Sequence, residues 1–230
     1  MKHPAALDHR RGLGDALLRL RRFDRGALSQ IEAVEDGRWW FGAMTVHVAL
    51  LRAVNVGGRS LAMADLKAML GALGLGQART LLQSGNVVLD VAARSGDALE
   101  SFLEAETQKR LRLKADYLVR TAEEWETIIA DNPFRRQAKD DPARLVLIPL
   151  KTAPTETRLS SLEAAIKGRE SVRANGRELY VVYPDGIGRS KLTVALIERK
   201  LATRCTARNW NTVLKLQALV ETFAGGVLRT

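Results

Sequence analysis

The residues with the clearest chemical potential lie in the segment 183–193, Tyr-Pro-Asp-Gly-Ile-Gly-Arg-Ser-Lys-Leu-Thr. This segment separates an apolar run from a helical pattern and combines two glycines with basic and hydroxyl side chains. Glycines allow backbone N–H groups to turn toward one side, and the N-terminus of a following helix carries partial positive charge. The segment therefore predicts an anion-binding site, and we expect it to use Asp185, Gly186, Gly188, Arg189, Ser190 and Lys191.

Two more specific nucleotide-binding motifs do not fit this segment. Its Gly-Ile-Gly-Arg-Ser-Lys order is not the Gly-Lys-Ser/Thr order of a P-loop, and Lys191 occupies the third glycine position of a dinucleotide fingerprint. The similarity to phosphate-binding loops is generic, and no cofactor is indicated.

The elements that position this segment follow a pattern that occurs twice. The first copy begins with the apolar run Val46–Val54, followed by a helical pattern from Met63 to Leu73. Strands at 78–83 and 86–91, a helix around 99–111 and a strand at 116–120 complete the order β-α-β-β-α-β. Thr121 and Glu124 then form a capping box that opens a further helix, which ends before Pro133.

The second copy follows the charged stretch 135–142, which we interpret as a linker or exposed loop. A strand at 144–150, a helix at 156–167 and a hairpin of 171–174 and 178–183 come first, and Asn175-Gly176 is a strong signal for a type I′ turn. A helix at 189–201, a short strand at 204–207 and a closing helix at 210–223 follow.

The fold class that this pattern predicts is α+β. We expect two ferredoxin-like (βαββαβ) two-layer units with antiparallel sheets, at 44–134 and 143–230, plus the C-terminal helix. Residues 1–43 differ from the rest. We interpret them as a poorly packed extension, and translation that begins at Met44 would make them an annotation artefact.

This topology places polar loops next to one another. The first two strands of such a unit run parallel, so the loop after the first strand and the central hairpin turn share one end of the sheet. The third and fourth strands run the opposite way, which places 185–189 at the same end as 208–211. We expect the polar residues of these loops to contribute to ligand binding, namely Arg52, Asn55, Gly57, Gly58, Gln83, Ser84, Asn86, Arg208, Asn209 and Asn211. The alternative for each loop is ordinary turn formation and helix capping.

Catalytic constellations are scarce. His47 is the one histidine outside 1–43, and the sequence contains no His/Cys cluster of the kind that binds metal. Acid/base chemistry would have to use Asp185 or Lys191, activated by burial. An aspartate before two glycines is more often a turn former.

The composition sets limits on partners and location. The 230 residues carry a net charge of +10, which attracts phosphate or nucleic acid, although interleaved acidic residues indicate mostly solvated faces. No stretch approaches the roughly 20 apolar residues of a membrane span, and the start lacks the apolar centre of a signal peptide, so we expect a cytoplasmic protein without a membrane partner. Cys205 is the single cysteine, and we expect a buried thiol.

The loop segments also carry a family resemblance. The stretches 49–58, 63–66, 83–87, 132–134, 183–192 and 207–213 resemble, in order and spacing, the bacterial family known as domain of unknown function 1697. Ala53 stands where that family usually has glycine, and the loop after Gly58 is shorter than usual. The resemblance implies an α+β fold and a role for these loops, but it implies no reaction.

Three functional hypotheses follow. The first is a binding protein for an anionic small molecule, such as a nucleotide or another phosphorylated metabolite. The second is nucleic-acid binding through the basic surface, although no aromatic platform for stacking bases is evident. The third is an enzyme on a phosphorylated or acyl substrate, with Asp185 or Lys191 as its acid/base group. The sequence does not indicate an oligomeric state.

Overall fold

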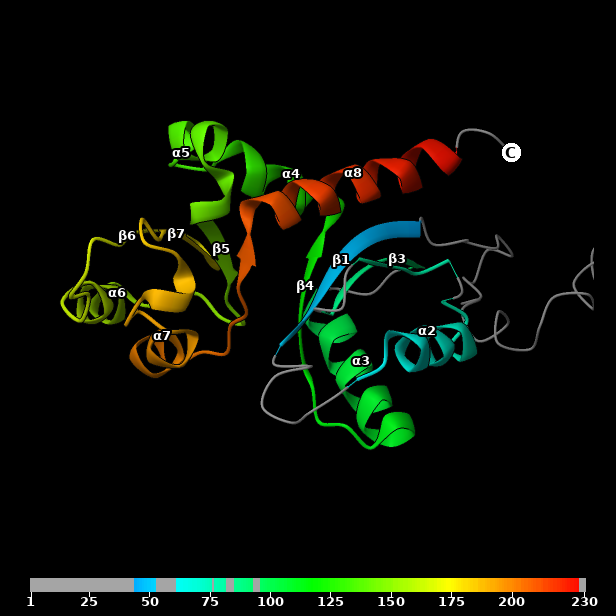
Figure 1. The fold of residues 1–230 in the computed structure, drawn as a ribbon. Coiled ribbons are helices and arrows are strands. Elements are labelled where there is room, and N and C mark those ends of the chain that lie inside the picture. Colours follow the sequence, from blue (N-terminus) through cyan, green and yellow to red (C-terminus); the bar gives the residue numbers. More distant parts are fainter. Residues whose placement is uncertain (1–43, 53–60, 76, 82–84, 93–95, 228–230) are drawn as a thin grey trace, which may run out of the picture. The chain divides into compact units, whose positions relative to one another are not determined.

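The structure is a computed structural model that describes residues 44–52, 61–75, 77–81, 85–92 and 96–227 (Figure 1). All of them belong to one structural unit, Ala43–Thr230. Two four-stranded antiparallel sheets and seven α-helices make up this part of the chain, which confirms the predicted α+β class.

The first sheet has the strand order β2-β3-β1-β4, and each neighbouring pair is antiparallel. Its two central strands are long and apolar, and Val48 of β1 lies opposite Val88 of β3. Two helices, α2 and α3, lie on one side of this sheet (Figure 1). The elements are β1 (Met44–Arg52), α2 (Met63–Ala72), β2 (Arg79–Leu81), β3 (Asn86–Ala92), α3 (Gly96–Leu111) and β4 (Asp116–Thr121).

The second sheet repeats this arrangement with the order β6-β7-β5-β8. Leu147 of β5 lies opposite Tyr180 of β7 on one side and Arg208 of β8 on the other. Helices α6 and α7 lie beside this sheet (Figure 1). The elements are β5 (Leu145–Pro149), α6 (Glu156–Glu163), β6 (Ser171–Asn175), β7 (Glu178–Val182), α7 (Val194–Leu201) and β8 (Arg208–Asn209). Both strand orders are compatible with the predicted ferredoxin-like arrangement.

The central strands are buried on both faces, which explains why their sequences are continuously apolar rather than alternating. Along β1, Ala49 and Leu51 face α2 and α3, whereas Val48 and Leu50 face the opposite way. There they join a cluster that we call the shared core, because it takes residues from both sheets. Its buried members are Val48, Leu50, Val88, Leu118, Trp125, Ile128, Leu145, Leu147, Tyr180, Trp210, Val213, Leu216, Val220 and Phe223.

The shared core also takes side chains from α4 (Ala122–Ala130) and α8 (Trp210–Val227). Trp125 of α4 is completely buried, and its Nε1 donates a hydrogen bond to the Val213 carbonyl of α8 at 3.4 Å. Because the indole N–H finds an acceptor, this large ring is buried without an unsatisfied polar group. The sequences 44–134 and 143–230, which we call the first and second halves, therefore contribute to one common apolar interior.

Three connections differ from the sequence predictions. The stretch interpreted as a loop contains α5 (Arg135–Asp140), a helix without buried residues whose Arg136 pairs with Asp140 at 3.3 Å. The predicted strand at 204–207 is replaced by β8, preceded by an isolated bridge between Leu150 and Cys205. Residues 187–189 form a 3₁₀ turn, and α7 begins only at Val194.

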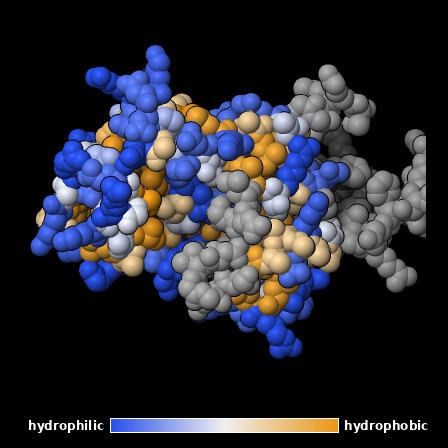
Figure 2. Space-filling model, viewed as in Figure 1, coloured by the Kyte–Doolittle hydropathy of each residue, from blue (hydrophilic) through white to orange (hydrophobic). Residues whose placement is uncertain are grey.

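The face of the molecule drawn in Figure 2 is largely polar. On the face shown in Figure 2, hydrophilic residues cover much of the described part, with smaller apolar patches between them. Ile187 and Leu214 are the exposed large hydrophobic side chains of the described residues. None of the helices in this part of the chain combines the length and apolar content that crossing a membrane requires.

Candidate functional site

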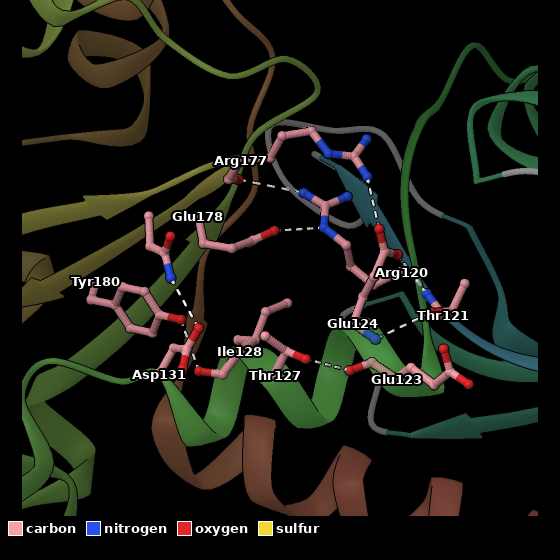
Figure 3. Close-up of a pocket in the computed structure, with 11 residues that line it drawn as sticks. Arg120, Thr121, Glu123, Glu124, Thr127, Ile128, Asp131, Arg177, Glu178 and Tyr180 are labelled. Atoms are coloured by element: carbon pink, nitrogen blue, oxygen red, sulfur yellow. Dashed lines mark hydrogen bonds and ion pairs between the residues drawn. The ribbon is translucent and has the colours of Figure 1, made fainter.

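A groove of about 430 Å³ lies between α4 and the β6–β7 hairpin (Figure 3). This volume falls within the range of small-molecule sites. Its lining is mostly charged and polar, and it takes side chains from both halves of the chain. The lining residues are Arg120, Thr121, Glu123, Glu124, Thr127, Ile128, Asp131, Asn175, Arg177, Glu178 and Tyr180.

One wall of the groove is a face of α4, and the capping box predicted from the sequence fixes where that helix begins. The Thr121 hydroxyl accepts a hydrogen bond from the Glu124 N–H at 3.1 Å, and the Glu124 carboxylate accepts one from the Thr121 N–H at 2.8 Å. Glu124, Ile128 and Asp131 then recur at helical spacing, which places them on one side. The structure confirms the cap and shows which face it orients.

The opposite wall comes from the hairpin. Gly176 has φ +56°, the left-handed conformation expected of the predicted Asn-Gly turn. Arg177 and Glu178 follow this turn and extend toward Arg120 and α4 (Figure 3). The Tyr180 hydroxyl donates a hydrogen bond to the Ile128 carbonyl at 2.8 Å, which holds the hairpin against the helix.

The floor of the groove contains a buried ion pair. Arg120 Nε donates to Glu178 Oε1 at 2.6 Å. Further guanidinium N–H groups donate to backbone carbonyls at 2.8, 2.9 and 3.4 Å, those of Val119, Leu150 and Arg177. The second carboxylate oxygen, Glu178 Oε2, is buried and has no hydrogen-bond partner among the described residues. Burial raises the pKa of Glu178 to about 7, because lost hydration outweighs the attraction of Arg120.

The predicted anion loop uses several of its polar groups internally. Gly186 has φ +86°, and its N–H donates to the Tyr183 carbonyl at 2.9 Å. A Cβ at Gly186 would lie 3.3 Å from Arg144 Nη1, which holds the turn by donating to the Pro184 carbonyl at 2.8 Å. The backbone N–H of Gly186 therefore belongs to the turn, and the turn itself requires the glycine.

The side chains of this loop divide into two groups. Asp185 pairs with Arg169 at 2.5 Å, and the Ser190 hydroxyl donates to the Glu170 carboxylate while it accepts from the Leu192 N–H at 2.9 Å. Arg189 and Lys191 are exposed, and neither forms an ion pair within the part of the chain that the structure describes. Gly188 is exposed as well.

The prediction that a helix begins directly after the glycines is wrong. Helix α7 begins at Val194, because the Thr193 hydroxyl accepts a hydrogen bond from the Leu196 N–H at 3.2 Å and caps the helix there. Arg189 closes a 3₁₀ turn instead. The partial positive charge of the α7 N-terminus therefore lies at Thr193 and not at the glycines.

Three other predicted residues make contacts between the two halves. The buried Arg208 donates to the Asn86 side-chain oxygen, to the Leu51 carbonyl at 3.0 Å and to the Gly85 carbonyl at 3.5 Å. Burial lowers its pKa to about 10. Arg52 forms a forked pair with Glu198 of α7, with distances of 2.5 and 2.7 Å. These contacts join the halves.

The strand register places the loop after β7 and the start of α8 at one end of the second sheet. Val182 pairs with Leu145, and Asn209 pairs with the next residue of β5, Val146. Asn209 caps α8, since its side-chain oxygen accepts from the N–H and the hydroxyl of Thr212 at 3.0 and 2.9 Å. The loop after β7 and the start of α8 therefore lie at the same end of the sheet, as predicted, but Asn209 acts there as a helix cap.

The remaining predicted residues are Asn211 and those outside the described part of the chain. Asn211 is exposed on the first turn of α8. The predicted residues that lie outside the described ranges are Asn55, Gly57, Gly58, Gln83 and Ser84.

Cys205 is completely buried, as expected. Burial raises the pKa of its thiol to about 12, so the reactive thiolate is disfavoured. Within the described ranges, no group of three or more His, Cys, Asp or Glu side chains is arranged to hold a metal ion.

Sequence reasoning missed the groove, although two signals pointed to it. Arg120 is a charged residue inside the apolar strand β4, and Glu178 begins the apolar strand β7. A charge in a buried strand requires a partner. The two residues are 58 positions apart, and no local pattern indicates that they pair with each other.

The fold and the groove define an α+β protein with two antiparallel sheets and a charged groove between its halves. The chain belongs to the family described as "Protein of unknown function (DUF1697)", which matches residues 44–180, and this confirms the resemblance seen in the sequence. The matched range ends before the Asp185–Lys191 loop and before Arg208.

Solved structures with a similar fold match this chain. One of them is that of the conserved bacterial protein SP0830 from Streptococcus pneumoniae, with a TM-score of 0.60 and 20% sequence identity. The similarity covers 77% of this chain and 99% of that protein. No curated protein matches the sequence.

Proposed function

We propose that this protein binds a small anionic molecule, such as a phosphorylated metabolite or a nucleotide, at the Asp185–Lys191 loop. The observation that carries the proposal is the exposure of two cationic side chains, Arg189 and Lys191. The two exposed cations are separated by a single residue, and neither is neutralised by an ion pair within the described residues. A phosphate placed there would gain two charge-assisted contacts.

Part of the backbone that the sequence suggested as an amide cradle is used within the turn, because the N–H groups of Gly186, Arg189 and Ser190 donate to backbone carbonyls. Arg144 fixes the Pro184 carbonyl, and Arg169 neutralises Asp185, the acidic residue closest in sequence to the two cations. Binding by exposed cations is weakened by salt screening. We therefore expect modest affinity that falls as salt is added.

A thermal-unfolding experiment tests this proposal. Inorganic pyrophosphate and ATP are added to the wild-type chain and to Arg189→Ala and Lys191→Ala. Binding to the native state alone raises the unfolding temperature. We expect a concentration-dependent rise in the wild type and a smaller rise in each variant.

Lys215→Ala is the matched control, because it removes the same kind of charge from an exposed position of α8. This variant keeps the wild-type response if the loop is the site. Equal responses in all four proteins would reject the assignment.

The two other hypotheses gain less support. Exposed basic side chains occur on separate elements, for example Lys109 on α3 and Arg136 on α5. A steep loss of affinity for DNA or RNA with salt would favour the nucleic-acid hypothesis. Asp185 and Lys191 are both exposed, so the burial that would activate them as acid/base groups is missing.

A further inference from the structure

The groove between α4 and the β6–β7 hairpin has more acidic than basic groups. Four carboxylate side chains and two guanidinium groups line it. The acidic residues come from both walls, because α4 and its C-terminal end supply three of them and β7 supplies Glu178. This local balance is opposite in sign to the net charge of +10 of the whole chain.

Both guanidinium groups already make hydrogen bonds or ion pairs within the protein. Arg120 makes four hydrogen bonds, to Glu178 and to three backbone carbonyls. Arg177 makes two ion pairs of 3.3 Å, with Asp97 and Glu124. An incoming anion would compete with these carboxylates, so the groove is poorly suited to phosphate.

The carboxylates, in contrast, have acceptor capacity left. The Glu178 side chain is only 9% exposed, yet its Oε2 has no partner among the described residues. The exposed Asp131 accepts a weak side-chain hydrogen bond, from Asn175 at 3.4 Å. An unsatisfied buried oxygen costs free energy, and a donor that reaches it recovers that cost.

We propose that this groove binds an elongated organic cation that carries amine or guanidinium groups. Glu124 lies in the first turn of α4 and Asp131 is the C-cap that follows it, and their spacing in sequence corresponds to about 10 Å along the helix axis. Carboxylates separated in this way suit a ligand with a positive charge near each end better than a single ion. Glu178, between the two walls, offers its free oxygen to an N–H group of the same ligand.

Arg177 determines how the cation reaches Glu178. Its guanidinium has the same sign as the ligand and lines the groove (Figure 3). Its partner Asp97 is 84% exposed, so this ion pair is weak. The ligand therefore displaces the Arg177 side chain, and removing that side chain favours binding.

Isothermal titration calorimetry with spermidine tests this proposal, at fixed ionic strength and at a mildly alkaline pH that keeps Glu178 ionised. We expect saturable binding to the wild-type chain and about tenfold weaker binding to Asp131→Asn and to Glu178→Gln, the loss of one charge-assisted hydrogen bond in each case. We expect tighter binding to Arg177→Ala. The matched control, Asp65→Asn, removes an exposed carboxylate from α2 and leaves the affinity unchanged.

The outcomes separate clearly. Asp131 is exposed, so Asp131→Asn carries the test even if Glu178→Gln disturbs the buried pair. The proposal is overturned if the wild type shows no saturable heat, if Asp131→Asn and Asp65→Asn bind equally well, or if Arg177→Ala binds more weakly. The anion site uses other residues, so its failure and the failure of this site are independent results.

Discussion

Glu178 and Arg120 show how one pair of residues connects folding with the groove. The carboxylate is held by its partner at 2.6 Å but is shielded from water. Breaking such a pair by removing one partner leaves the other charge buried and uncompensated, which typically costs about 3–5 kcal/mol. Glutamine at position 178 keeps the shape and one hydrogen-bond acceptor, so it is the gentler test of the charge.

The raised pKa of Glu178 predicts a pH dependence of stability with a definite sign. Its pKa rises from 4.5 to about 7 on folding, so between these values the folded chain binds the proton more tightly than the unfolded chain does. The contribution of Glu178 to stability is therefore present below pH 4.5 and is lost as the pH rises to about 7. Arg120, Arg177 and Glu124 are the charged groups that act on it.

Urea unfolding of the wild type and of Glu178→Gln at several pH values checks this sign. Relative to the variant, the wild type is expected to lose about 3 kcal/mol between pH 4.5 and about pH 7. Using the difference between the two proteins removes the contributions of other titrating groups. A difference that stays constant, or that changes in favour of the wild type as the pH rises, contradicts the assignment.

At the scale of elements, the caps decide where helices begin and end. The capping box at Thr121 is predictable because its two residues are close in sequence and interact locally. The predicted start of α7 at position 189 is too early, and the basic residues Arg189 and Lys191 would oppose the partial positive charge of a first helical turn there. The hydroxyl of Thr193, however, provides the acceptor that the first N–H groups need.

The C-terminus of α7 leads to a prediction about stability. Ala202 caps this helix in the left-handed conformation, with φ 50° and ψ 41°, where a Cβ is unfavourable. Ala202→Gly is expected to raise the free energy of unfolding by about 0.5–1 kcal/mol, because the relieved strain exceeds the added entropy of the unfolded chain.

Chemical denaturation of Ala202→Gly measures this gain, with Ala218→Gly as the control. Ala218 is exposed in the interior of α8, so glycine there should destabilise by about 1 kcal/mol. Equal destabilisation by both substitutions would show that the conformation of Ala202 carries no strain.

At the scale of the whole molecule, the repeated pattern of elements makes the two sheets predictable. Which side chains enter which core is not predictable, because it depends on which helices cover the two faces of each sheet. Val48 and Ala49 are both apolar neighbours in the sequence, yet they face different cores. Likewise, Arg208 and Asn86 are expected at ligand-binding loops, and the structure uses them to join the halves across 122 positions of sequence.

The Asp185–Lys191 loop could be predicted from the sequence and the groove could not, because the loop depends on local interactions and the groove on tertiary contacts. The positive φ of Gly186 follows from local turn chemistry, and the exposure of Arg189 and Lys191 follows from the hydration that charged side chains keep outside apolar segments. The groove depends on Arg120 and Glu178 meeting across the two halves. Tertiary contacts of this kind leave no periodic signal in a single sequence.

The central claim, that Arg189 and Lys191 bind an anion, is tested most directly by a nuclear magnetic resonance titration. Inorganic pyrophosphate is added to the isotope-labelled chain, and the backbone amide signals are followed. We predict saturable shifts concentrated in residues 185–192, reduced in Arg189→Ala. Shifts that are absent, that grow without saturation over all basic segments, or that centre on residues outside this loop would contradict the account.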